Sequence, residues 1–226
     1  MGYYLLLLGF PMLLALWAQF RVKGAFGQWS QFRAASNLTG AEAARAVLES
    51  AQIHDVEVLQ IEDMLGDHYD PANKRLCLSP DVYNTPSVAA LGIAAHEAGH
   101  AIQHARGYAP LHARMALVPI TMISSQILPF VFLGGIFFQF TGLITIGFWC
   151  YLILTAFQLI TLPVEFDASR RAKVILGQMG MIEPGEEARG VNKVLNAAAL
   201  TYVAAFVGSL ANLLHFWMMM QGRDRE

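Results

Sequence analysis

The sequence predicts a mainly α-helical integral membrane protein with a small β-hairpin or sheet element on its cytoplasmic side. Hydrophobic residues make up 55% of the 226 residues and charged residues only 14%, whereas charged residues account for about 25% of a typical soluble domain. The mean hydropathy is +0.43. Four long apolar segments alternate with more polar stretches that contain two strand-like patterns. A soluble fold of this size would struggle to bury so much apolar surface.

The charge balance and the cysteines exclude two classes of protein. The formal net charge is −2, so no basic surface for nucleic acid is indicated. Cys77 and Cys150 lie far apart in dissimilar contexts, which fits neither a disulfide framework nor a CxxC metal site. We therefore expect a lipid bilayer rather than nucleic acid as a partner, and two free thiols.

Apolar residues divide the chain into five regions. Residues 1–20 are expected to form a first transmembrane helix, retained as an anchor because no basic stretch precedes it. Residues 21–114 are mostly polar and would lie at and outside the membrane interface. Residues 115–162 are expected to form a transmembrane helical hairpin, and residues 163–195 to connect it to the fourth apolar helix and tail at residues 196–226.

The polar region begins with two helix signals. Val22, Phe26 and Trp29 recur at helical spacing among basic and polar residues, which indicates either an amphipathic helix in the membrane interface or a helix that faces the protein core. Thr39 and Glu42 form the pattern of a capping box, in which each side chain satisfies a backbone amide at the start of a helix.

Two strands and a long helix are expected next. Asp55–Met64 has alternating character and Lys74–Leu78 is a second strand candidate, with turn residues in Asp70–Asn73 between them. We also expect Lys74–Leu78 to be a sheet edge that could pair with an extended peptide. Thr85 and Pro86 then predict an N-cap and first turn for a helix that runs to about Arg106.

Basic residues predict the orientation of the chain in the membrane. They cluster after the first apolar segment, before the second and after the third. By the positive-inside rule these three regions would face the cytoplasm, in a multi-pass arrangement. The clusters are Arg21, Lys23, Arg33 and Arg45; Arg106 and Arg114; and Arg170, Arg171 and Lys173.

The most specific motif is His96-Glu97-Ala98-Gly99-His100, an HEXXH pattern on the expected helix. Residues four apart on a helix leave the same face, so both imidazoles can reach one zinc ion. Zinc activates a water molecule and polarises a carbonyl, and Glu97 can act as the general base and acid. Two histidines with purely structural roles are the alternative explanation. The motif therefore predicts a metallopeptidase site with one catalytic Zn²⁺.

A catalytic zinc site needs a third protein ligand and an open position. Metzincins place a histidine ten residues after the first, and here that position is Arg106. Glu165, on the helix-forming segment that leaves the third apolar stretch, is the better candidate, with an ion pair to Arg170 or Arg171 as the alternative. His104 would lie too far along the helix to share the metal easily.

At these residues the chain resembles the YugP-type neutral zinc metallopeptidases of bacterial membranes, which are distantly HtpX-like. The resemblance rests on ordered blocks that cover nearly the whole chain, among them 87–103, 161–172 and 194–204. It implies a gluzincin-like membrane peptidase with His96 and His100 as ligands and Glu97 as acid and base. The HtpX-type resemblance implies Glu165 as third ligand, but the acidic residue expected four positions later is Ser169 here. Asp167, Ser169 or neither of them could then orient the first histidine.

Three functions remain to be compared. A zinc endopeptidase acting on membrane or juxtamembrane proteins fits the motif best. An intramembrane site-two-type protease would need an aspartate ligand in a later span, and that motif is missing. A non-enzymatic metal-stabilised scaffold or quality-control adaptor would need a closed site with four ligands. Candidates for a group that stabilises the transition state stay open: His68, Tyr69, His104, Tyr108, His112 and Tyr202.

Overall fold

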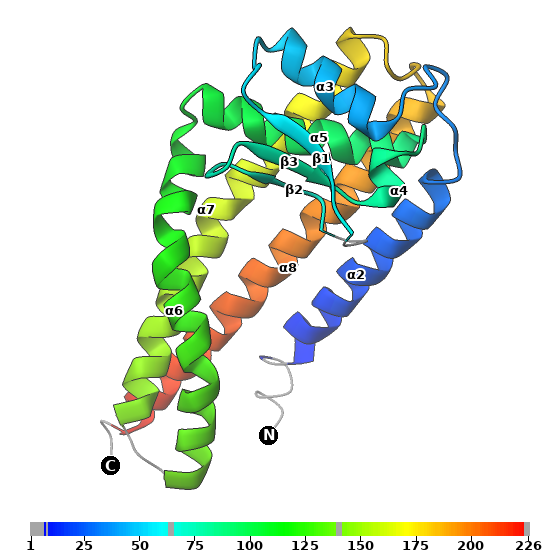
Figure 1. The fold of residues 1–226 in the computed structure, drawn as a ribbon. Helices are drawn as coiled ribbons and strands as arrows, with labels where there is room; N and C mark the ends of the chain where they lie inside the picture. The colour runs from blue at the N-terminus through cyan, green and yellow to red at the C-terminus, as the bar shows by residue number, and fades with distance from the viewer. Residues whose placement is uncertain (1–6, 8, 63–65, 139–141, 224–226) are drawn as a thin grey trace.

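The computed structural model describes residue 7 and residues 9–62, 66–138 and 142–223. Four long helices extend from a head that contains three shorter helices and a small sheet (Figure 1). The long helices are α2 (Phe10–Trp29), α6 (Ala109–Phe138), α7 (Gly142–Gln178) and α8 (Glu186–Arg223). The head contains α3 (Gly40–Ser50), α4 (Pro80–Tyr83) and α5 (Val88–Ala105), together with β1 (Glu57–Gln60), β2 (His68–Asp70) and β3 (Arg75–Leu78).

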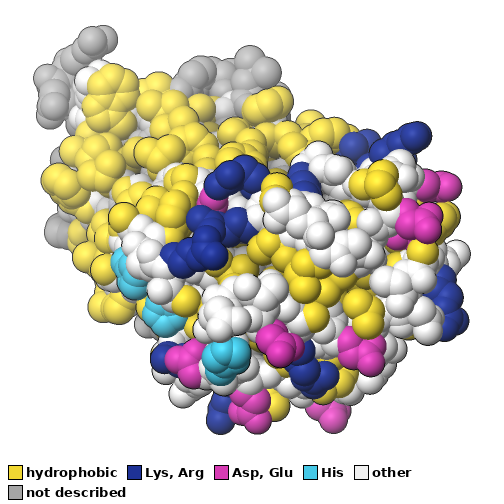
Figure 2. Space-filling view, turned by 90° about the horizontal axis from the view of Figure 1, so that it is seen from above, with side chains coloured by type: hydrophobic (Ala, Val, Ile, Leu, Met, Phe, Trp, Pro, Cys, Tyr) yellow, Lys and Arg dark blue, Asp and Glu magenta, His cyan; other side chains and the backbone are white. Residues whose placement is uncertain are grey.

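Three of the long helices are long and apolar enough to cross a membrane: Ala109–Gly134, Gly142–Gln178 and Glu186–Gln221. Their large hydrophobic side chains are exposed away from the head, for example Phe130 and Trp149. Figure 2 shows hydrophobic side chains covering the part of the molecule away from the head, with charged side chains and histidines gathered on the head. A mainly helical protein with three candidate membrane helices is therefore confirmed.

The first expected span lies partly outside the described residues, which omit residues 1–6 and 8. From Phe10 onward α2 is one helix that joins the apolar segment to the stretch containing Val22, Phe26 and Trp29. Trp29 is 4% exposed and belongs to the core of the head, and Phe26 packs against that core. The end of α2 is therefore a core-facing helix rather than one that lies free in the interface.

The three-stranded sheet has the order β1-β3-β2. β1 pairs with β3 in parallel, and β2 pairs with β3 antiparallel through the turn that follows Asp70. The expectation that Lys74–Leu78 is a sheet edge is therefore wrong, because β3 is the central strand. The sequence pattern missed β2, which is only three residues long and too short to show alternation. Residues 63–65, at the end of the expected first strand, lie outside the described part of the chain.

The core of the head forms between α3, α5, the sheet and the adjoining ends of α7 and α8. The capping box of α3 is confirmed: Glu42 accepts a hydrogen bond from the Thr39 amide, and the Thr39 hydroxyl accepts one from the Glu42 amide. α5 begins two residues later than expected, because the Ser87 hydroxyl caps it by accepting from the Ala90 amide. The caps fix the starts of two helices that contribute to this core.

α6 and α7 run antiparallel, and α7 continues without a break through Pro163 and back into the head. The hairpin junction, residues 139–141, lies outside the described residues. α8 returns from the head along α7, and the last residues of the expected tail, 224–226, are likewise not described. Because α7 is continuous, its head end packs against α5 and brings distant segments of the sequence together.

Candidate metal centre

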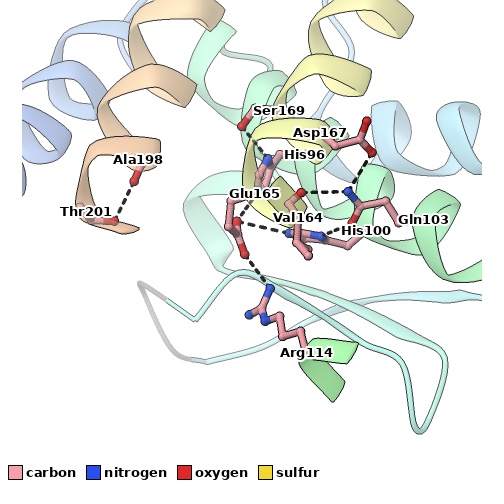
Figure 3. A network of polar contacts seen from close by, with 10 residues as sticks. All are labelled: His96, His100, Gln103, Arg114, Val164, Glu165, Asp167, Ser169, Ala198 and Thr201. Carbon is pink, nitrogen blue, oxygen red and sulfur yellow. Dashed lines mark hydrogen bonds and ion pairs between the residues drawn. The ribbon is translucent and has the colours of Figure 1, made fainter. Parts of the chain in front are cut away.

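Two histidines from α5 and one glutamate from α7 converge inside the head, as Figure 3 shows. The ligand atoms of His96, His100 and Glu165 all lie within 4.8 Å of one another. Glu165 Oε2 is 3.2 Å from His96 Nε2 and 3.5 Å from His100 Nε2. Glu165 is 1% exposed. The structure thus brings together the three residues for which the sequence suggested a shared metal.

A close crossing of α5 and α7 makes this convergence possible. Gly99 lies between the two histidines, and a Cβ atom at this position would meet the Ala168 carbonyl oxygen at 3.0 Å and the Ala168 Cα at 3.3 Å. Such contacts are too short for ordinary packing. Glycine at position 99 therefore allows the α7 backbone to approach the helix that carries both histidines.

The outer nitrogen of each imidazole has its own partner. Ser169 Oγ is 3.2 Å from His96 Nδ1, and Gln103 Oε1 is 3.0 Å from His100 Nδ1. The Gln103 amide also donates to the Val164 carbonyl at 2.8 Å and to Asp167 at 3.0 Å. An Nδ1 held in this way leaves Nε2 free as a ligand atom. Both histidines consequently present Nε2 toward Glu165.

The other oxygen of Glu165 is held by an arginine. Arg114 Nη1, near the start of α6, lies 2.7 Å from Glu165 Oε1. This pairing compensates the negative charge of the buried carboxylate and leaves its Oε2 facing the histidines. Glu165 therefore pairs with Arg114 rather than with Arg170 or Arg171, which both pair with Asp167.

Glu97 lies beside these groups in a cavity of about 220 Å³. Its side chain is buried, and burial raises the pKa of its carboxyl above the ordinary value, although the neighbouring imidazoles oppose this shift. The cavity is lined by Asp67, His68, Tyr69, Pro71, Glu97, His100, Leu111, Arg114, Met115, Val118, Glu165 and Tyr202. A carboxylate, two ligand groups and a strand of the sheet therefore share one hollow.

The other residues considered for stabilising the transition state or orienting a histidine fall into two groups, inside and outside the cavity. His68, Tyr69 and Tyr202 line the cavity. His104 does not, because its Nδ1 contacts the Tyr69 hydroxyl at 2.9 Å on another side of α5. Asp167 contacts neither histidine directly and acts through Gln103. Tyr108 and His112 are also absent from the cavity lining.

Sequence reasoning missed Gln103 and Arg114 as members of this site. Gln103 carried a usable signal, because it lies three residues after His100 and hence near the same face of the helix. Arg114 carried no such signal in the sequence, because its approach to Glu165 depends on the turn between α5 and α6. Ser169, one of two open candidates, contacts His96, as its position four residues after Glu165 allows.

The donor set suits zinc. Two neutral imidazole nitrogens and one carboxylate oxygen form a common catalytic zinc set, and zinc accepts them in a tetrahedral arrangement with one further position. Among residues 7, 9–62, 66–138 and 142–223 no other group of histidine, cysteine and acidic residues meets the same spacing. The group itself has three ligand residues in that part of the chain, which leaves a fourth position open.

Comparisons with known proteins agree with this chemistry. A family model described as "Putative neutral zinc metallopeptidase" matches residues 4–221. The "Putative membrane protease YugP" of Bacillus subtilis (strain 168) is 46% identical over 214 residues, which cover 94% of this chain and 95% of that protein. No solved structure matches the chain. The resemblance found in the sequence is confirmed: the chain belongs to the YugP-type family of neutral zinc metallopeptidases.

Proposed function

We propose that this protein is a membrane-embedded zinc metallopeptidase of gluzincin-like type, with His96, His100 and Glu165 as the ligands of one zinc ion. The observation that carries the proposal is the convergence of these three side chains, two of which, His100 and Glu165, line one cavity with Glu97. Family membership supports the choice of zinc and of peptide hydrolysis. The three-donor set favours an open, catalytic site over a closed structural one, and hence an enzyme over a metal-stabilised scaffold.

The residues have separate roles in this reaction. A zinc ion bound here would lower the pKa of a water molecule and polarise the scissile carbonyl. Glu97 accepts the proton of that water and delivers it to the leaving amine. Gln103 and Ser169 hold the imidazoles in the orientation that exposes Nε2. Tyr202 and His68, which line the same cavity, are the groups placed to donate to the developing negative charge.

The edge of the sheet offers a place for the substrate. β2 pairs with β3 on one side, and no other strand of the described chain pairs with its second side. His68 and Tyr69 of β2 line the cavity that contains Glu97. An extended peptide can add to this edge through backbone hydrogen bonds. Met115 and Val118 of α6 complete the cavity on the side of the candidate spans, which favours membrane or juxtamembrane substrates.

The proposed location is the bacterial inner membrane, with the head in the cytoplasm. The basic clusters that lie around the start of α6 and follow the apolar part of α7 support this orientation. The two natural cysteines are buried, so a Glu49→Cys variant provides one exposed thiol on the head. Labelling by a membrane-impermeant reagent only after cells are opened is expected. Labelling of intact cells that matches labelling of opened cells would reverse the orientation.

The function is tested by replacing the general base alone. Glu97→Gln is expected to retain about one zinc per chain and to lose casein-type proteolysis by at least about a hundredfold, because proton transfer is removed. Glu49→Gln, an exposed carboxylate on α3, serves as the control and should cleave as wild type does. Equal cleavage by Glu97→Gln and wild type would refute the mechanism. Zinc-loaded wild type that cleaves neither casein nor membrane proteins would favour the scaffold.

A further inference from the structure

A second hollow lies between α7 and α8, apart from the cavity that contains Glu97. Its volume is about 470 Å³. It is lined by Phe166, Ser169, Arg170, Lys173, Val174, Asn196, Ala199, Leu200 and Val203. Only Ser169 also contacts the metal centre, where its hydroxyl meets His96 Nδ1. We call this hollow the α7–α8 groove, and nothing in the proposed peptidase reaction uses it.

The α7–α8 groove is polar at one end and apolar at the other. α7 runs toward the head and α8 runs away from it, so Lys173 and Asn196 lie at the head end of the groove. Their side chains meet there, with Lys173 Nζ donating to Asn196 Oδ1 at 2.7 Å. Phe166 and Val203 lie toward the apolar parts of the two candidate spans. The groove is thus oriented like an amphiphile in one leaflet of a bilayer.

The polar end carries excess positive charge. Lys173 is hydrogen-bonded to a neutral amide rather than to a carboxylate. The nearby carboxylate of Asp167 is shared between Arg170 and Arg171, each at 2.5 Å. Two arginines on one carboxylate leave one positive charge, to which Lys173 adds another. An anionic group bound at this end would therefore be attracted by uncompensated cations close to the membrane surface.

We propose that the α7–α8 groove binds an anionic phospholipid, with its phosphate at Lys173 and Arg170 and one acyl chain along Phe166, Leu200 and Val203. A zwitterionic lipid would bring its own cation to the basic end and gain less. A free phosphate would leave the apolar half unfilled. The proposal rests on the proposed membrane position of α7 and α8 but not on peptide hydrolysis, so lipid binding and proteolysis can fail independently.

The test measures lipid retention by the full-length protein in detergent. Native mass spectrometry would compare phosphatidylglycerol with phosphatidylcholine of identical acyl chains. Wild type is expected to retain phosphatidylglycerol at least about fivefold better, and Lys173→Gln to remove most of that preference, because one basic residue near an anionic lipid surface contributes about this factor. Lys173→Arg should preserve it. Lys23→Gln changes an exposed basic residue of α2 outside the groove and should leave retention unchanged.

Two further measurements distinguish binding of the whole lipid from binding of its phosphate group alone. Leu200→Trp fills the apolar half and should reduce retention of both lipids, whereas millimolar inorganic phosphate should not displace bound phosphatidylglycerol. Helical circular dichroism checks that each variant is folded, and Lys173→Gln decides the outcome if Leu200→Trp is not. Equal retention of the two lipids by wild type, an unchanged preference in Lys173→Gln, or displacement by inorganic phosphate would each overturn the proposal.

Discussion

Gln103 offers a direct test of how the metal centre is held. Its side chain is 0% exposed and joins three groups: His100 Nδ1, the Val164 carbonyl and Asp167. Gln103→Leu keeps the approximate volume but removes all three hydrogen bonds. Loss of a partner that orients a metal-binding histidine typically lowers metal affinity about 10–100-fold, which corresponds to about 1.4–2.7 kcal/mol.

The same change also affects folding, and a second variant separates the two effects. A buried carbonyl and carboxylate that lose their donor cost about 1–3 kcal/mol of unfolding free energy. Gln103→Glu keeps an acceptor for His100 Nδ1 but loses the donor to Val164 and Asp167. We therefore expect Gln103→Glu to lose stability while its zinc affinity stays closer to that of wild type than the affinity of Gln103→Leu does.

The assay is competition for zinc against a chromogenic chelator, with thermal unfolding of the metal-free protein measured in parallel. His104→Gln is the matched control, because His104 lies one turn beyond His100 along α5 and contacts Tyr69 instead of the metal centre. It should bind zinc as wild type does. If Gln103→Leu also binds zinc with wild-type affinity, the hydrogen bond that Gln103 Oε1 accepts from His100 Nδ1 does not orient His100 and the reasoning fails.

Three further predictions concern the same centre. Gly99→Ala should lower kcat/KM about tenfold and Gly99→Val about a hundredfold or more. The added side chain forces α5 and α7 apart, and a misplacement of the site by about 1 Å can cost that much activity. Gly92→Ala is the control and should have little effect, because its Cβ would meet Val191 at an ordinary 3.5 Å. Arg114→Gln should enlarge the rise in melting temperature on adding zinc, since the ion then replaces the arginine as the cation beside Glu165 Oε1; an unchanged rise would contradict this. Removal of zinc by EDTA should abolish proteolysis, and stoichiometric zinc should restore it, as measured on casein.

The sequence predicted the parts of the fold that depend on local pattern. Apolar runs predicted the helices that became α6, α7 and α8, and the capping box at Thr39 predicted the start of α3. The error over the sheet has a physical cause. β2 has three residues, so its place between β1 and β3 in sequence, and the central position of β3, follow from pairing across the sheet rather than from any periodic pattern.

The candidate metal centre, too, could be predicted from the sequence only in part. The spacing of His96 and His100 alone indicates that they share a helix face, and Glu97 lies beside the first of them in the same motif. Glu165 was a candidate because of its position after an apolar run, but its approach to the histidines depends on the contact between Gly99 and Ala168. Arg114 could not be predicted, because the sequence does not specify how α6 leaves α5.

The order of the ligands along the chain has a consequence for biosynthesis. Glu165 follows His96 by 69 residues, and α6 and the first part of α7 are synthesised in between. A nascent chain that has emerged only as far as α5 carries the two histidines and the proposed general base Glu97, but it lacks the buried carboxylate of Glu165, the proposed third ligand. Under the proposed mechanism, hydrolytic activity therefore arises only after α7 has been made and has packed against α5. An incompletely synthesised chain would then lack peptidase activity.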